Sequence, residues 1–74
     1  MNATQLVNGT SARVIKLGGG GLFAAKLSAM GIVPGTIILK KSHSILHGPI
    51  VIQNGPVQIA IGYRMAQKIV VELL

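Results

Sequence analysis

Short segments of apolar residues, several of them alternating with polar ones, make up most of the chain. The clearest is residues 57–61, where every second residue is Val or Ile, so that the apolar side chains share one face of an extended strand. The other segments are rich in β-branched residues, which favour strands. We therefore predict five strands, over residues 12–17, 36–42, 50–53, 57–61 and 69–73.

One segment follows a helical spacing instead. Phe23, Leu27 and Met30 lie at positions i, i+4 and i+7, which form a single stripe on an α-helix. The spacing predicts a short helix over residues 22–30, between the first and second strands. A helix this short is stable only when its apolar stripe covers something, and the sheet is the available surface.

The residues after this helix predict a cap and a turn. Gly31 fits the left-handed position that ends many helices, because glycine has no Cβ to clash there. Ile32 would then fold back onto Leu27, the apolar contact that accompanies such a cap. Pro34-Gly35 predicts a tight turn into the second strand.

Glycine and asparagine mark the other connections. A turn is predicted at Asn8-Gly9 in the lead-in, which comprises residues 1–11, and the four glycines of residues 18–21 form a connector into the helix. Asn54-Gly55 predicts a hairpin, although a two-residue loop there would need an N–H that Pro56 lacks.

A short helical turn is predicted before the last strand, over residues 62–68, with Met65 facing inward. Together these elements predict one domain over residues 1–74. It is mainly β, with one short α-helix between strands 1 and 2, and five short strands with tight connections favour a small, strongly bent barrel. Closure of the barrel would remove its sheet edges.

Charge narrows the class of partner. Seven Lys and Arg face a single acid, Glu72, which gives a net charge of +6 and favours nucleic acid, an anionic membrane surface or an acidic protein. We expect the cations on the surface, including an exposed pair at Lys40-Lys41. The stretch over residues 42–63 has no Lys, Arg, Asp or Glu, but it alternates like a strand and contains Pro and Gly, so we expect no membrane insertion. The absence of cysteine excludes disulfides and fits a cytoplasmic protein.

Candidate chemistry is sparse. His43 and His47 are weak candidates for metal ligands, because two ligands do not make a site. Any divalent ion there would be weakly or adventitiously held, and no cofactor is required.

Catalysis is not expected, since no acid near these histidines could orient one of them. The glycine run lacks the Gly-Lys-Ser/Thr sequence of a phosphate loop.

The motifs resemble those of the FeoA family, small cytoplasmic partners of the bacterial ferrous iron transporter. The resemblance runs from about Val14 to Val71 and is carried mainly by the Leu-x-x-Met-Gly-Ile-x-Pro-Gly segment of residues 27–35. Weaker support comes from the glycines before the helix, Gly-Pro-Ile-Val-Ile at 48–52, Ile-Ala-Ile-Gly at 59–62 and the Ala-x-x-Ile-Val-Val segment of residues 66–71.

This resemblance implies an SH3-like β-barrel and a non-enzymatic role in ferrous iron uptake. The implied partner is the cytoplasmic GTP-binding part of the membrane transporter, which would place the chain at the inner face of the membrane. Two alternatives stay open: a small basic nucleic-acid-binding barrel, disfavoured because aromatic stacking residues are few, and an SH3-like domain that senses transition metals. The state of oligomerisation, including a homo-oligomer, is not determined.

A partner surface is predicted at the end of the helix. Ile32 and Val33 are consecutive and cannot both face inward in an extended segment, so one of them is expected to be exposed. With Lys26 and Met30 they form the partner-binding surface that we predict from the sequence.

Overall fold

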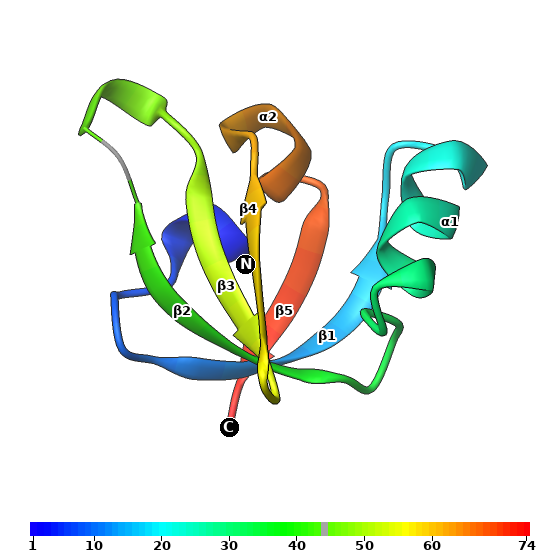
Figure 1. Ribbon diagram of the computed structural model, residues 1–74, viewed down its shortest axis with the longest axis horizontal. Helices are drawn as coiled ribbons and strands as arrows, with labels where there is room; N and C mark the ends of the chain where they lie inside the picture. Colours follow the sequence, from blue (N-terminus) through cyan, green and yellow to red (C-terminus); the bar gives the residue numbers. More distant parts are fainter. Residues whose placement is uncertain (44) are drawn as a thin grey trace.

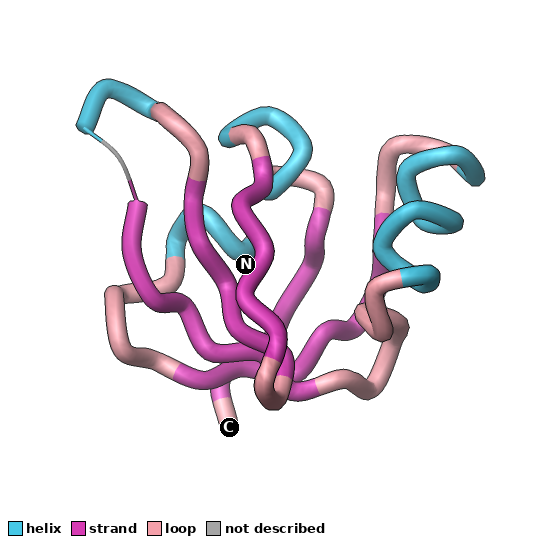
Figure 2. The backbone as a smooth tube through the Cα atoms, in the orientation of Figure 1, coloured by secondary structure: helices cyan, strands magenta, loops and turns pink. Residues whose placement is uncertain are grey.

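The structure is a computed structural model that describes the chain except Ser44, and the side chains of His43 and Ile45 also lie outside the described part. Figures 1 and 2 show a curved sheet with a helix standing beside it. In chain order the elements are η1 (Ala3–Gln5), β1 (Ser11–Leu17), α1 (Gly21–Ala29), β2 (Ile37–His43), η2 (Ile45–His47), β3 (Ile50–Asn54), β4 (Val57–Ile61), α2 (Tyr63–Ala66) and β5 (Ile69–Leu73).

The strands form one antiparallel sheet in the order β4-β3-β2-β1-β5. This confirms the predicted class, mainly β with a helix between the first two strands. Register shifts between Val14 and Lys16 on β1 and between Lys40 and Ser42 on β2 mark the irregularities that let a small sheet bend sharply. The predicted removal of edges is wrong in the described ladder, because β4 and β5 remain its two edge strands.

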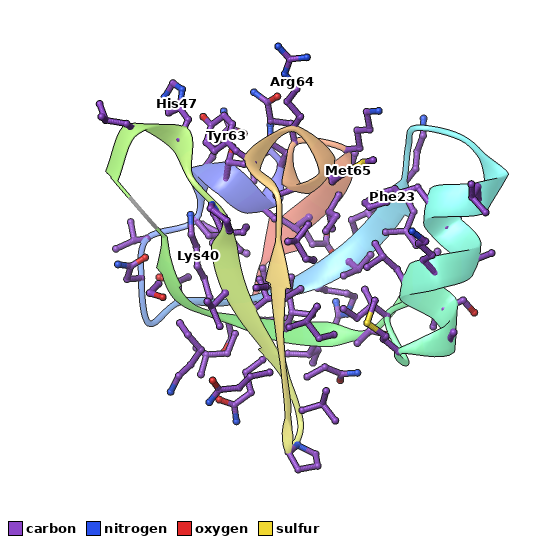
Figure 3. All side chains as sticks on the ribbon, turned by 45° about the horizontal axis from the view of Figure 1, so that its top comes forward. Phe23, Lys40, His47, Tyr63, Arg64 and Met65 are labelled. Atoms are coloured by element: carbon purple, nitrogen blue, oxygen red, sulfur yellow. The ribbon has the colours of Figure 1, made fainter. Side chains whose placement is uncertain are left out.

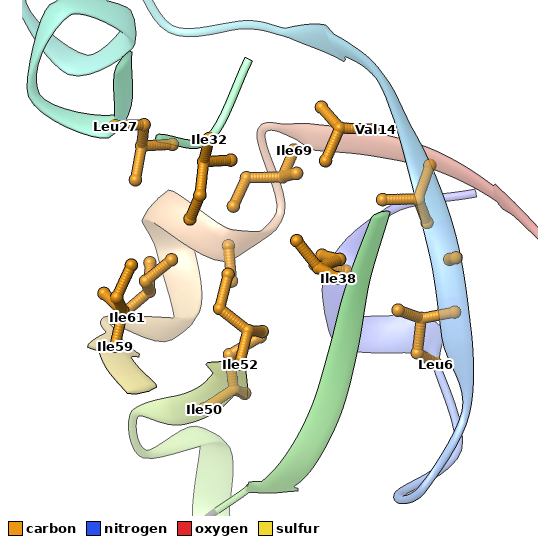
Figure 4. Packing of buried hydrophobic residues seen from close by; sticks show 14 residues of the cluster. Leu6, Val14, Leu27, Ile32, Ile38, Ile50, Ile52, Ile59, Ile61 and Ile69 are labelled. Carbon is orange, nitrogen blue, oxygen red and sulfur yellow. The ribbon is translucent and has the colours of Figure 1, made fainter. Parts of the chain in front are cut away.

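An aliphatic core fills the concave side of the sheet (Figure 4). Each strand contributes alternate residues, as the period of two requires, and α1 adds Leu27. The largest apolar side chains that are almost fully buried are Leu27, Ile32, Ile38, Ile50, Ile52, Ile69 and Val14.

The predicted end of α1 is confirmed. Gly31 has a φ of 83°, its N–H donates to the Ser28 carbonyl at 2.9 Å, and the Ile32 N–H donates to the Leu27 carbonyl at 2.8 Å. These two bonds define the left-handed helix cap in which the residue after the glycine turns back toward the last helical turn. Ile32 is fully buried, whereas Val33 is 39% exposed, so the two consecutive residues do face opposite ways.

The turns follow the sequence closely, with one shift. Gly35 has a φ of 96° and the Thr36 N–H donates to the Val33 carbonyl at 3.0 Å, as in a Pro-Gly turn. In the β3–β4 hairpin the closing pair is Asn54 and Val57, so the loop is Gly55-Pro56 and not Asn54-Gly55. This shift by one residue places Val57 where an N–H is needed and Pro56 where none is.

The lead-in is ordered and covers one edge of the sheet. Asn2 caps η1 by accepting from the Thr4 N–H at 2.9 Å, and Gln5 returns the contact by accepting from the Asn2 N–H at 2.8 Å. Asn2 also bridges Val70 of β5. The predicted turn at Asn8-Gly9 is confirmed, with Gly9 at a φ of 86°.

Two predicted orientations are wrong. Lys40 is buried, at 1% exposure, because it shares the inward face of β2 with Ile38 and reaches the lead-in, where its ammonium donates to the Thr4 carbonyl at 2.9 Å (Figure 3). Met65 is 45% exposed and Ala66 is buried in its place, since α2 turns its small residue toward the core. Within the described residues, no helix is long and apolar enough to span a membrane.

Candidate functional site

One face of α1 is turned toward the sheet. Phe23, Lys26, Leu27 and Met30 lie at i, i+3, i+4 and i+7, which places them together along the helix. Leu27 enters the core and Phe23 is half-buried against it, whereas Lys26 and Met30 stay exposed. The helix therefore presents a partly apolar wall with one cation on it.

The end of β4 and the helix after it form the opposite wall. Together the two walls enclose a groove of about 200 Å³, which we call the α1–β4 groove. Its lining residues are Phe23, Lys26, Leu27, Met30, Ile59, Ala60, Ile61, Gly62 and Met65. Phe23 and Met65 are labelled in Figure 3, on α1 and α2.

The chemistry of this groove suits an apolar group with a negative charge beside it. Leu27, Ile59 and Ile61 are buried, so they supply an aliphatic floor. Met30 and Met65 are 41% and 45% exposed, and methionine side chains adapt readily to different apolar ligands. Lys26 is the charged residue of the lining, with no carboxylate beside it in the groove.

The residues predicted as a partner surface are only partly brought together. Lys26 and Met30 both line the α1–β4 groove. Ile32 is fully buried, so its assignment to an exposed contact surface is wrong; its side chain serves as the anchor of the helix cap. Val33 is exposed but lies outside the groove lining, and its role as a contact stays a prediction.

No sequence pattern indicates that α1 lies beside β4 and α2. Met65 was expected to face inward, and Ala60 and Gly62 carry no side-chain chemistry that marks a binding site. The helix face itself was visible in the spacing from Phe23 to Met30. The opposite wall comes from residues about 30 positions later, and only the folded sheet brings the two walls together.

Of the two candidate metal ligands, His43 and His47, the structure describes the side chain of His47 alone. His47 stacks on Tyr63 with ring centroids 4.3 Å apart and the planes inclined by 13°. The side chain of His43 lies outside the described part, so the pair remains a prediction. Among the residues described, no three His, Cys, Asp or Glu gather as a metal site would require.

The basic surface is smaller than the sequence indicated. Lys40 is inside the domain, and Arg13 pairs with Glu72 at 3.3 Å, both side chains being about half exposed at 47% and 54%. An exposed pair of this kind contributes little to stability. The pair does affect the charge distribution. The single carboxylate side chain is held on β5 beside β1, so the other surface cations have no carboxylate side chain to pair with.

Comparison with known proteins identifies the family. The model of the FeoA domain matches residues 1–73. A crystal structure of an iron uptake regulatory protein, FeoA, is 31% identical and superposes with a TM-score of 0.87, covering 100% of this chain and 96% of that one. No curated protein sequence gives a match.

Two further solved structures share the fold. The iron(II) transport protein A of Clostridium thermocellum is 36% identical with a TM-score of 0.91, covering 100% of this chain and 46% of that one. The zinc complex of Stenotrophomonas maltophilia FeoA, described as a prokaryotic SH3 domain protein, is 24% identical with a TM-score of 0.82, covering 97% of this chain and 89% of that one. At that identity the second likeness shows the fold, an SH3-like barrel.

Proposed function

Because this chain belongs to the FeoA family of ferrous iron transport accessory proteins, we propose that it binds the cytoplasmic GTP-binding part of the ferrous iron transporter through the α1–β4 groove. The observation that carries this proposal is the groove itself. An apolar hollow with exposed methionines and a cation at its wall is the kind of surface that protein partners occupy. The chain then works at the inner face of the membrane, held there by its partner.

We further propose that the chain acts without catalysing a reaction and without a resident cofactor. Support comes from the scarcity of acidic residues, because the single carboxylate side chain, that of Glu72, is exposed and paired with Arg13. General acid–base catalysis needs a titratable group held against a substrate, and this carboxylate is held on the β5 side of the domain.

The test is a titration of the full chain with the purified cytoplasmic domain of the transporter, with and without guanine nucleotide. We expect binding by the unmodified chain and at least a tenfold loss for Met30→Asp, because a carboxylate at the groove wall must be desolvated when the partner docks. The matched control is Val7→Asp, which changes an apolar residue that is 73% exposed and lies outside the groove.

The possible outcomes distinguish the proposed function from the two alternatives. If the unmodified chain does not bind the domain, the proposal is wrong. If Val7→Asp loses as much affinity as Met30→Asp, the α1–β4 groove is not the binding surface. Tight binding to an oligonucleotide that weakens steeply with salt would favour the nucleic-acid alternative instead. Stoichiometric ferrous ion binding that is lost in His43→Ala or His47→Ala would favour the metal-sensing alternative.

A further inference from the structure

The α1–β4 groove follows the open edge of the sheet. Its lining includes Ile59 and Ile61, which face the core, and also Ala60, which is exposed and lies between them on β4. Residues of both faces of a strand can line the same hollow only where that hollow runs along the backbone edge. β4 is an edge strand, paired with β3 on one side alone.

The register of the β3–β4 hairpin shows which backbone groups face the groove side. Asn54 and Val57 close a two-residue loop, and such a closing pair is hydrogen-bonded. Hydrogen-bonded and non-hydrogen-bonded pairs then alternate along an antiparallel ladder, so Gln58 and Ala60 direct their N–H and C=O groups away from β3. Both residues are exposed.

The opposite edge of the sheet, along β5, is covered by another segment of the chain. On β5 the Val71 N–H donates to the Met1 carbonyl at 2.9 Å, and Asn2 bridges Val70, so the lead-in covers that edge. In the described structure, no corresponding segment covers β4 at Gln58 and Ala60. An uncovered edge with apolar side chains beside it is a template for strand addition.

We propose that the α1–β4 groove takes an extended acidic segment of the partner, which adds to β4 as a sixth strand. Its backbone pairs with Gln58 and Ala60, and its alternate apolar side chains enter the hollow between Phe23, Met30 and Met65. The carboxylates between them point out of the hollow, where the exposed Lys26 attracts them. This inference rests on the proposed function, because the segment belongs to the transporter's cytoplasmic part.

Charge selects this occupant over a second copy of the same chain. Two copies would each bring a net charge of +6 to the contact, and like charges repel. An acidic segment meets the opposite sign at Lys26. Strand pairing itself is independent of sequence, so the charge and the apolar hollow supply the specificity.

The decisive variant is Ala60→Pro. Proline removes the N–H of Ala60, which points away from β3, so the hairpin keeps its own hydrogen bonds and the edge loses one donor. Ala60→Ser is the matched control because it keeps that donor. A thermal melt checks that both variants fold.

The probe is an eight-residue peptide of alternating leucine and glutamate, titrated into the isotope-labelled full chain and followed by NMR. We expect binding to the unmodified chain and to Ala60→Ser, slowed amide exchange at Gln58 and Ala60, and at least a tenfold weaker affinity for Ala60→Pro. A peptide of alternating leucine and lysine should bind at least tenfold more weakly, since Lys26 repels it. An N-methylated version of the acidic peptide should also fail, which tests backbone pairing without any change to the protein.

Three results would overturn strand addition: no binding of the acidic peptide, equal binding by Ala60→Pro, or equal binding of the N-methylated peptide. The same variants tested against the transporter's cytoplasmic domain separate this inference from the proposed function. If that domain binds Ala60→Pro as well as Ala60→Ser, the proposed function stands and strand addition fails. If the domain binds neither but the peptides behave as expected, the partner is wrong and the groove still takes a strand.

Discussion

Gly31 satisfies two separate requirements at one position. Its φ of 83° lies in the left-handed region, which side chains with a Cβ adopt only at a cost. A Cβ at this residue would also lie 2.9 Å from Nδ2 of Asn54, which donates to the Met30 carbonyl at 3.4 Å. The absence of a side chain thus lets the β3–β4 hairpin dock against the end of α1.

In Gly31→Ala, the left-handed backbone conformation alone should lower the free energy of unfolding by about 1–2 kcal/mol. The displacement of the Asn54 side chain should add to this loss. Gly35→Ala is the matched control, because Gly35 has a φ of 96° but open space where a Cβ would sit. Chemical denaturation should show the larger loss for Gly31→Ala, and the difference should shrink in an Asn54→Ala background. Equal losses in the two variants would contradict the role of the Asn54 contact.

At the scale of elements, the lead-in joins β2 to β5 and shields Lys40. Gly9 N–H donates to the Lys40 carbonyl at 2.7 Å, and the Lys40 N–H donates to the Thr10 carbonyl at 3.0 Å. The Lys40 ammonium reaches the carbonyl of Thr4, which lies within η1 of the same segment. The cost of this arrangement is desolvation of a charge, and burial lowers the pKa of Lys40 below its usual value of 10.5.

This lowered pKa predicts how stability changes with pH. Between the pKa of Lys40 in the folded state and its higher value in the unfolded chain, the unfolded state binds more protons, so stability rises as pH increases through that alkaline window. Lys40→Met removes the titrating group. Denaturation midpoints measured from neutral pH to about pH 10 should therefore rise in the unmodified protein relative to Lys40→Met.

Lys41→Met serves as the control for the loss of one positive charge, because Lys41 is the exposed neighbour of Lys40 on the same strand. Its stability should follow that of the unmodified protein across the same pH range. If Lys40→Met follows it as well, burial of the ammonium has no energetic effect and the explanation fails.

At the scale of the whole molecule, a chain of 74 residues without cysteine depends on a small aliphatic core. The Cα radius of gyration is 10.8 Å, and a core of this size leaves a net stability of only about 3–5 kcal/mol. A single buried side chain is therefore a large share of the total.

Ile32 and Val33 offer the sharpest comparison, because they are neighbours with opposite environments. Ile32→Ala should cost about 2–5 kcal/mol by leaving a cavity between α1 and the sheet, which is enough to unfold a large fraction of the protein. Val33→Ala should change stability by no more than about 0.5 kcal/mol, since Val33 is 39% exposed. Thermal unfolding measures both, and similar losses would contradict the assignment of one residue to the core and the other to the surface.

Local hydrogen bonding explains why the end of α1 and the Pro-Gly turn were predictable from the sequence. The cap bonds join residues only three to five positions apart, and the φ values of Gly31 and Gly35 are ones that few other residues accept. The strands were predictable for the same kind of reason, because alternation is a property of one segment. The predicted hairpin loop begins one residue earlier than the observed loop, because pairing across the sheet sets the register.

The sequence by itself therefore determined the five strands, the helix α1 and the helical turn α2, their order, and the one face of α1 that runs from Phe23 to Met30, but not the short helices η1 and η2. The tertiary structure alone decided that Lys40 lies inside, since alternation on β2 leaves two possible faces and the lead-in selects one. It also decided that β4 stays an open edge beside α1, which makes the groove. The physical reason is that burial and strand pairing depend on contacts between residues far apart in the chain. The spacing of residues within one segment does not predict those contacts.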